Sequence, residues 1–258
     1  METMRELFRY RDLIWELVTR DLKVRYRRSA LGFLWSMLQP LLTMGVLMIV
    51  FSSIFRFDIK NYPVYALSGI LFWNFFQQSI VVSMNSLRVH AYVLQKLPVP
   101  MAVFPISTVL SGLVNLLLAL VPLLGLLIAT GHKMGPSLLF LPVSILIATL
   151  FTLGAGMMLA PLSVFFTDIV EMVTVGLMLF FYLTPIFYPK EIVQGTSYYP
   201  IIHYNPLRSI LEVFRDPIYY SKIPPLSHLS LSLLVTVLAL AIGYWAFKRS
   251  IDRIPFYL

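Results

Sequence analysis

The sequence predicts an all-α membrane protein with six transmembrane helices, an N-terminal amphipathic helix at the membrane interface and short re-entrant helices before the last span. Two observations lead to this fold class. Of the 258 residues, 59% are hydrophobic and only 12% are charged, which is about half the charge of a soluble domain. The charged residues also cluster outside six long stretches that contain none. The chain has no cysteine, so disulfides, thiolate metal sites and a cysteine nucleophile are excluded.

The six charge-free stretches hold 18 to 36 residues each, and a helix needs about 20 apolar residues to cross the hydrocarbon. Runs such as residues 116–121 are apolar throughout, whereas a strand of an outer-membrane barrel would alternate. We therefore expect helices, organised as one domain. The predicted spans are residues 31–55, 65–87, 103–129, 138–162, 174–188 and 229–247.

Lysine and arginine predict the orientation of these spans. Residues 1–29 hold eight of them, and the connection after the second span and the C-terminal tail add five more on the same side. The positive-inside rule then places both termini in the cytoplasm. The net charge of +8 is attributed to this topology and to membrane lipid contact. Nucleic-acid binding is not expected, because no compact basic domain is present.

Residues 5–28 are expected to form a helix that lies on the membrane, because its apolar residues repeat at helical spacing. Two interpretations remain open: the helix is only a lipid anchor, or it also grips a cytoplasmic partner. The predicted apolar stripe comprises Tyr10, Leu13, Ile14, Leu17, Val18 and Leu22.

Two further patterns concern packing. Gly154, Gly156 and Ala160 place small residues on the fourth span, which usually indicates close contact between helices. The external segment before the last span also contains helical spacing, at Leu207, Ile210, Leu211 and Phe214. Two short helices that dip into the outer leaflet would fit this segment.

The spans lack the ionisable side chains that most membrane chemistry requires. This argues against an ion-coupled transporter, which must bind its driving ion, and against an intramembrane transferase or protease. Asp168 and Glu171 are the adjacent carboxylates that a transferase would need, but their spacing is more typical of a helix N-terminus. The four histidines stand singly and no nucleotide-binding glycine motif occurs. No catalytic or metal site is predicted, so the chain is a passive pore or scaffold, or a partner supplies the energy.

Aromatic residues are the positive feature of the spans. Their faces can stack on the apolar faces of sugar rings without charge, although packing against lipid or neighbouring helices would use the same pattern. The candidates for lining a substrate path are Phe33, Trp35, Phe72, Trp73, Phe75, Phe76, Phe180, Phe181 and Tyr182.

Six sequence stretches carry a family resemblance. They are Asp21–Tyr26, Ser29–Trp35 with Pro40, Ser68–Trp73 with Phe75 and Phe76, Val164–Ile169, Thr184–Tyr188 and Tyr204–Leu207. In this order they resemble the permease subunits of ABC-type polysaccharide exporters, the type-2 exporters of O-antigen, capsule or teichoic acid. Each match is weak by itself, and together they cover nearly the whole chain.

The resemblance implies a homodimer paired with two copies of a separate ATPase, which would hold ATP and Mg; this chain itself would carry no cofactor. The substrate would be a polysaccharide linked to undecaprenyl diphosphate, and the chain would lie in the bacterial cytoplasmic (inner) membrane. A cytoplasmic helix between Arg88 and Pro98 would dock on the ATPase, with Arg88, His90, Gln95, Lys96 and Asp168 as coupling residues. Thr167 stands where many relatives have arginine, which weakens the expectation of an ionic contact there.

The resemblance also implies that aromatic belts line the channel and that an outer gate lies around Tyr204, Asn205 and Pro206. Two alternatives remain open on the sequence. One is a permease for teichoic acid, a drug or a lipid, and the other is an intramembrane lipid-sugar transferase.

Overall fold

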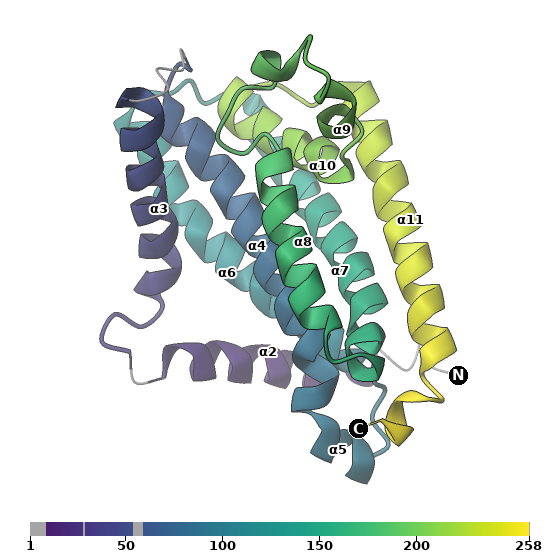
Figure 1. Ribbon diagram of the computed structural model, residues 1–258. Helices are drawn as coiled ribbons and strands as arrows, with labels where there is room; N and C mark the ends of the chain where they lie inside the picture. The colour runs from purple at the N-terminus through teal and green to yellow at the C-terminus, as the bar shows by residue number, and fades with distance from the viewer. Residues whose placement is uncertain (1–8, 28, 54–58, 258) are drawn as a thin grey trace.

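The computed structural model describes residues 9–27, 29–53 and 59–257, and every regular element in them is helical. Parts of the predicted first helix (5–8 and 28) and of the first span (54–55) lie outside the described residues. The long helices run side by side between two ends of the molecule (Figure 1). They are α3 (Leu34–Ser53), α4 (Tyr62–Val89), α6 (Val103–Ala129), α7 (Leu141–Phe165), α8 (Ile169–Leu183) and α11 (Leu226–Ser250).

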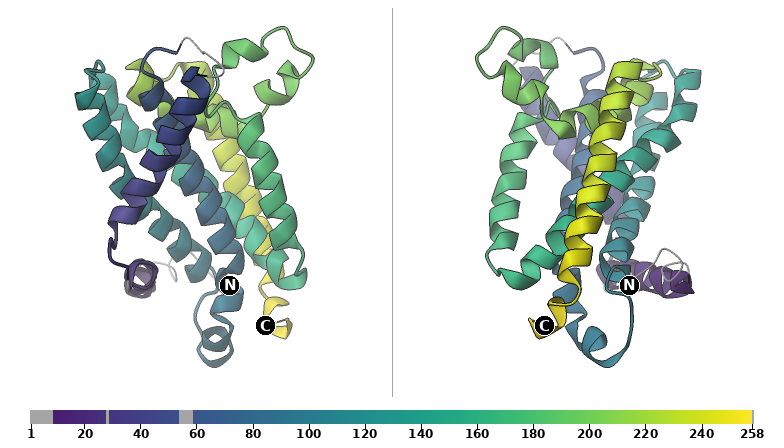
Figure 2. Two further views of the ribbon diagram at one scale, coloured as in Figure 1. Left: turned by 60° about the vertical axis from the view of Figure 1, so that its left-hand side comes forward. Right: turned by 90° about the vertical axis from the view of Figure 1, so that its right-hand side faces the viewer.

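Short elements occupy the two ends of this bundle. Helix α2 (Arg11–Tyr26) lies across one end, roughly perpendicular to the long helices, and α5 (Ala91–Lys96) projects from the same end (Figures 1 and 2). Helices α9 (Tyr199–His203) and α10 (Pro206–Arg215) lie at the other end. We refer to these as the α2 end and the α10 end.

The lengths of the helices agree with a multi-pass membrane protein. Among the described residues, Val103–Ala129, Pro136–Phe165 and Leu226–Ser250 are long and apolar enough to cross a bilayer. Helices α3 and α8 are apolar but shorter. Helix α4 has 28 residues, enough for about 42 Å of rise, but it carries several amide side chains. Six spans therefore remain a prediction, although α6 has the bounds that the sequence predicted.

Helix α8 ends earlier than the predicted span 174–188. The helix begins at Ile169 and ends at Leu183. It ends there because Thr184 precedes Pro185 and adopts an extended backbone with ψ of 132°. A residue before proline is pushed away from the helical region by the proline ring. The Pro-rich segment that follows is a connection to α9 and α10.

The apolar stripe of α2 packs on protein. Leu17 and Val18 are buried, and Tyr10, Leu13 and Ile14 pack against a cluster at this end. That cluster includes side chains of α6, α7 and α11, such as Phe104, Met157 and Phe247. The helix is thus fixed to the base of the bundle through the face that the sequence identified as apolar.

Helix α4 forms the centre of the bundle and packs against α3, α6, α7, α8 and α10. Its close approaches to neighbours depend on small residues. A Cβ on Gly112 of α6 would lie 2.2 Å from Ser79 Oγ, and one on Gly156 of α7 would lie 2.7 Å from Ser83 Oγ. The predicted close packing at Gly156 is confirmed, because any larger side chain would push α7 away from α4.

Candidate substrate path, coupling surface and outer cluster

The aromatic residues of α4 are buried inside the chain. Phe72 stacks near Phe76 with ring centroids 6.4 Å apart, and Trp73 packs 5.4 Å from Phe181. This differs from the expectation that they line a substrate path, because neighbouring helices of the same chain cover their rings. Phe75 is also buried, but its ring borders the cavity described below.

The remaining candidate aromatics are exposed; Phe33 lies in the turn before α3, and the others lie on α3 and α8, two helices with little buried surface. The exposed fractions are 52% for Phe33, 46% for Trp35, 42% for Phe180 and 56% for Tyr182. Leu177 is the buried residue of α8, so most of that helix faces outward. Phe33 and Trp35 lie near the α2 end, whereas Phe180 and Tyr182 lie near the α10 end (Figure 1).

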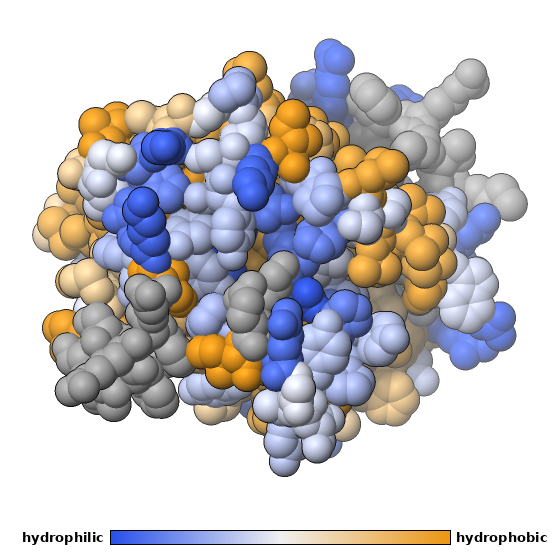
Figure 3. All heavy atoms as spheres, turned by 90° about the horizontal axis from the view of Figure 1, so that it is seen from above, coloured by the Kyte–Doolittle hydropathy of each residue, from blue (hydrophilic) through white to orange (hydrophobic). Residues whose placement is uncertain are grey.

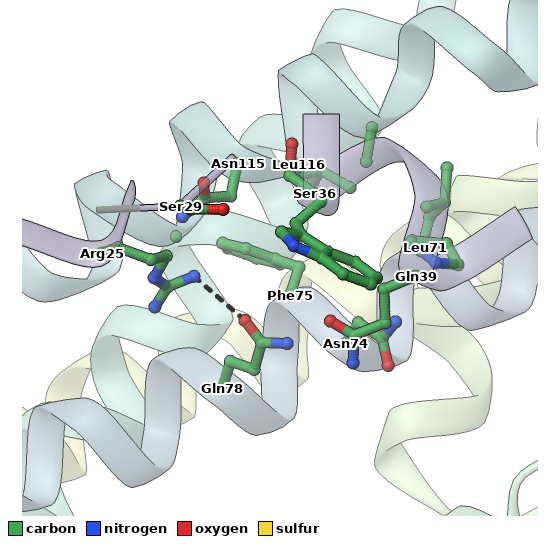
Figure 4. Close-up of a pocket in the computed structure, with 14 residues that line it drawn as sticks. Arg25, Ser29, Ser36, Gln39, Leu71, Asn74, Phe75, Gln78, Asn115 and Leu116 are labelled. Carbon is green, nitrogen blue, oxygen red and sulfur yellow. Dashed lines mark hydrogen bonds between the residues drawn. The ribbon is translucent and has the colours of Figure 1, made fainter. Parts of the chain in front are cut away.

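A cavity with largely apolar walls and several polar side chains separates α2 and α3 from α4 and α6. It consists of two adjoining hollows of about 270 and 790 Å³ that share Arg25, Gln78, Gly112 and Asn115. We call the whole cavity the amide groove, after the side chains that line its smaller part. Figure 4 shows Arg25 and Gln78 on one side of Phe75, with Gln39 and Asn74 on the other. Trp35 and Phe75, two of the aromatic residues predicted to line a substrate path, thus line one cavity, together with amides that the sequence did not single out.

Polar side chains of two facing helices form two stripes within the larger, mostly apolar part of the groove. Gln78 and Asn85 lie two turns apart on α4, and Thr108, Ser111 and Asn115 follow helical spacing on α6. Gly112 lets these two helices approach closely. The stripes therefore extend from the α2 end toward the middle of the bundle.

The predicted coupling residues divide into buried and exposed ones. Arg88 is partly buried and donates a hydrogen bond to the carbonyl of Ser163, so it joins α4 to the end of α7. Gln95 and Lys96 are exposed on α5, a helix with no buried residue. The Lys96 ammonium lies 3.9 Å from the centre of the Tyr92 ring. A surface for a partner is therefore available at α5, whereas Arg88 acts within the chain.

His90 is buried just after α4 and stacks on Phe104, with ring centroids 4.6 Å apart. Its Nδ1 donates to the carbonyl of Ser86 at 2.8 Å, and its Nε2 accepts from Arg20 of α2. Burial holds the pKa of His90 below its ordinary value, and the nearby Arg20 charge lowers it further. The hydrogen bond to Ser86 acts in the opposite direction. The neutral imidazole thus connects α2, α4 and α6.

Asp168 precedes α8 and is exposed; Thr167 donates a hydrogen bond to it at 3.1 Å. Glu171 is exposed in the first turn of the same helix. Both carboxylates therefore complement the positive end of the helix dipole. This arrangement gives no support to a transferase site, for which the two groups would have to converge on a substrate.

The predicted outer-gate residues surround the start of α10. Tyr204 and Pro206 are exposed, but Asn205 is buried. Asn205 Oδ1 caps α10 by accepting from the Leu207 N–H at 3.0 Å, and its Nδ2 donates to Thr184 Oγ1 at 3.0 Å. Asn205 thus links the end of α8 to the beginning of α10.

Helix α10 is buried along Leu207–Arg215, including the four apolar positions that the sequence identified. Its Arg215 donates to the carbonyls of Pro185 at 2.7 Å and Ile186 at 2.6 Å, and to Ser68 Oγ at 3.3 Å. The guanidinium also lies 3.9 Å from the Tyr65 ring centre. Gly69 makes room for it, because a Cβ there would lie 2.3 Å from Arg215 Nη2.

A second charged group joins α10 to α11. Arg208 and Glu212 form an ion pair at 3.0 Å, and His228 lies 3.4 Å from Glu212 and 3.8 Å from Asp216. Seen from this end, hydrophilic side chains occupy the middle and hydrophobic ones much of the rim (Figure 3). Within the described residues, no group of three His, Asp or Glu side chains could hold a metal ion.

Sequence reasoning missed these buried charges because it treated the segment between Lys190 and Pro225 as external. The signal was present: Arg208 and Glu212 are four residues apart between apolar neighbours, a spacing at which side chains meet on a helix. The partners of Arg215 lie far away in sequence and could not have been predicted.

Comparison with known proteins identifies the family. Residues 12–219 match the family model described as ABC-2 type transporter. The chain belongs to the ABC-2 type transporter family. The resemblance to ABC exporter permeases is therefore confirmed, and the protein is a membrane-spanning transporter subunit by family.

Relatives of this ABC-2 type transporter chain include the O-antigen export system permease protein RfbA of Myxococcus xanthus. It is 34% identical over 222 residues, which is 86% of this chain and 85% of the relative. Two proteins of that name from Klebsiella pneumoniae are 32% and 31% identical, each over 80% of this chain and 79% of the relative. The similarity therefore extends over most of both chains.

Proposed function

We propose that the chain is the membrane subunit of an ATP-driven exporter that carries lipid-linked polysaccharide of the O-antigen type across the bacterial inner membrane. The observation that carries this proposal is the similarity to O-antigen export permeases over most of the chain. The lipid would be undecaprenyl diphosphate. A separate ATPase, present in two copies, would bind ATP and Mg, and both termini of this chain would be cytoplasmic.

Two copies of the chain would enclose the path. Helices α3 and α8 each leave most of their surface uncovered, and exposed apolar surface on this scale is typical of contact with lipid or another subunit. Phe33, Trp35, Phe180 and Tyr182 would present aromatic faces to the passing sugar rings. The gate at the outer end would consist of α9, α10 and the residues around Tyr204.

Tyr182→Ala is expected to slow polysaccharide export by about three- to tenfold, the loss expected for one aromatic stacking surface. Surface polysaccharide is measured in cells that depend on this chain for export, together with the amount of protein in the membrane. The matched control is Tyr244→Ala, which removes an equally exposed ring from α11. Equal export by both variants would contradict a role for Tyr182 in the path.

We place the ATPase contact on α5, supported by α2. Helix α5 projects from the bundle and no described part of the chain buries it. Its Lys96 offers a positive charge to a partner, whereas Arg88 supports the helix from within.

Lys96→Glu is expected to reduce substrate-stimulated ATP hydrolysis by roughly fivefold, as reversal of an exposed charge contact would. The measurement uses the chain reconstituted with its ATPase in proteoliposomes. Lys222→Glu reverses an exposed charge at the α10 end and should leave ATP hydrolysis unchanged. Normal coupling in Lys96→Glu with intact complex assembly would remove α5 from the contact.

A further inference from the structure

The amide groove contains an exposed arginine whose charge no described residue neutralises. Arg25, at the end of α2, forms no ion pair with a described residue, and its one hydrogen bond within these residues goes to Gln78 Oε1 at 3.2 Å. Arg20 differs, because it pairs with Asp21 at 3.0 Å and contacts His90. Most of the N–H groups of Arg25 are therefore available to an anion, and a guanidinium is well suited to phosphate.

Amide side chains without hydrogen-bond partners among the described residues lie across Phe75 from Arg25. The side chains of Gln39 on α3 and Asn74 on α4 both line the groove, and neither forms a hydrogen bond with a described residue. Gln39 is exposed and Asn74 is half-buried, so both amides are open to the cavity. They face it from different helices and are free to bind water or a polar ligand there.

An aromatic surface completes the set. Trp35 and Phe75 line the same hollow as Gln39 and Asn74. Amide donors and acceptors beside aromatic rings suit a sugar, whose ring carries hydroxyl groups on its edge and C–H groups on its faces. The groove thus offers phosphate chemistry at Arg25 and saccharide chemistry at Gln39, Asn74 and Trp35.

The position of the groove fits a head group that is bound at a membrane surface. Arg25 belongs to α2, which lies across the end of the bundle, and Asn74 is about 16 Å farther along α4 than Asn85. Thus the cationic part lies at the interface and the amide part extends toward the membrane interior.

We propose that the amide groove binds the junction between the diphosphate and the first sugar of the lipid-linked glycan, with the phosphates at Arg25 and the sugar at Gln39 and Asn74. The site rests on the proposed function and adds to it a loading position at the α2 end. Substrate would bind here before the glycan moves along the path between the two copies.

The test measures binding to the full chain in phosphatidylcholine nanodiscs. The probes are undecaprenyl diphosphate, the same lipid carrying N-acetylglucosamine, and phosphatidylglycerol. Arg25→Gln should weaken binding of both diphosphate lipids at least about tenfold, as expected for loss of a charged hydrogen bond. The control is Arg27→Gln, which removes an exposed charge from the same end of α2; Arg27 does not line the groove. This variant should leave the binding of both diphosphate lipids unchanged.

Asn74→Leu tests the sugar position separately. It should weaken binding of the N-acetylglucosamine lipid about three- to tenfold and leave undecaprenyl diphosphate unaffected, since only the former reaches Asn74. A parallel measurement of melting temperature separates loss of the site from loss of the fold. If Arg25→Gln melts early, Arg25→Lys serves as the second variant, with weakened binding expected because the planar fork is lost.

The outcomes distinguish this site from the proposed function. If wild-type chain binds the diphosphate lipids and Arg25→Gln binds them equally well, the groove assignment alone is wrong. If phosphatidylglycerol competes equally and the sugar adds no affinity, the groove is a site for phospholipid head groups and the proposal is overturned. If wild-type chain binds no diphosphate lipid, both the site and the proposed substrate are rejected.

Discussion

Gly243→Ala is expected to destabilise the chain by about 3 kcal/mol, because α7 and α11 touch backbone to backbone. A Cβ on Gly243 would lie 2.1 Å from the carbonyl oxygen of Gly154 and 2.9 Å from its carbonyl carbon. Neither atom can rotate away, so the helices must separate along their contact. Alanine has a higher helix propensity than glycine, by about 1 kcal/mol, and this gain is too small to offset the clash.

The measurement is the melting temperature of the purified chain in detergent, together with the fraction that elutes as a single species. Gly125→Ala is the matched control: it makes the same substitution within α6, and nothing lies within 4 Å of the added atom. The control should match the wild-type protein or exceed it. Equal melting temperatures for Gly243→Ala and Gly125→Ala would show that α7 and α11 do not need this close approach.

Gly154 also shows how far the sequence predicts packing. Small residues on the fourth span indicated a close helix contact, and α7 does contact α4 at Gly156 and α11 at Gly154. The sequence did not identify Gly243 as the partner, because it lies 89 positions away and no local pattern connects the two. Local composition predicts that a helix has a contact face, whereas the choice of neighbour depends on the whole bundle.

The candidate site illustrates the same distinction. Aromatic residues at helical spacing predicted a special surface on α4, yet Phe72, Trp73 and Phe76 are buried core residues, since α4 lies at the centre of the bundle. The cavity that contains Trp35 and Phe75 is also lined by Gln39 and Asn74. Single amides in different helices carry no pattern of their own, so only the fold brings them together.

Helix boundaries follow the sequence where charge or proline sets them. The predicted span 103–129 is α6 in the structure, because Lys96 and two prolines precede it and a polar turn follows. The α8 boundary was predicted too late because Thr184–Pro185 ends the helix sooner than the next charge. Absence of charge marks where a span can lie, and backbone chemistry decides where the helix ends.

Arg215→Met is the second substitution from which we expect a large loss, about 3 kcal/mol of stability. Without the guanidinium, the carbonyl of Ile186 loses its hydrogen-bond donor, and that of Pro185 keeps only the Tyr65 hydroxyl at 3.4 Å. A buried carbonyl without a partner costs about 1–3 kcal/mol. The connection between α8 and α9 would detach from α4 and α10, and we expect export to fall with it.

The measurements are the melting temperature in detergent and the rate of proteolysis between α8 and α10. Lys222→Met is the control, because it removes one positive charge from an exposed side chain at the same end. Arg215→Lys should fall between the wild-type protein and Arg215→Met, since an ammonium cannot donate to both carbonyls with the same fork geometry.

Gly69→Ala tests whether the arginine acts through this contact. Its Cβ would lie 2.3 Å from Arg215 Nη2 and 2.8 Å from the Ile186 carbonyl oxygen, so the substitution should displace the guanidinium and weaken the same hydrogen bonds. Because both changes remove one set of interactions, the double variant Gly69→Ala with Arg215→Met should lose less stability than the sum of the two. Additive losses would mean that Arg215 stabilises the chain by a route other than the carbonyls of Pro185 and Ile186.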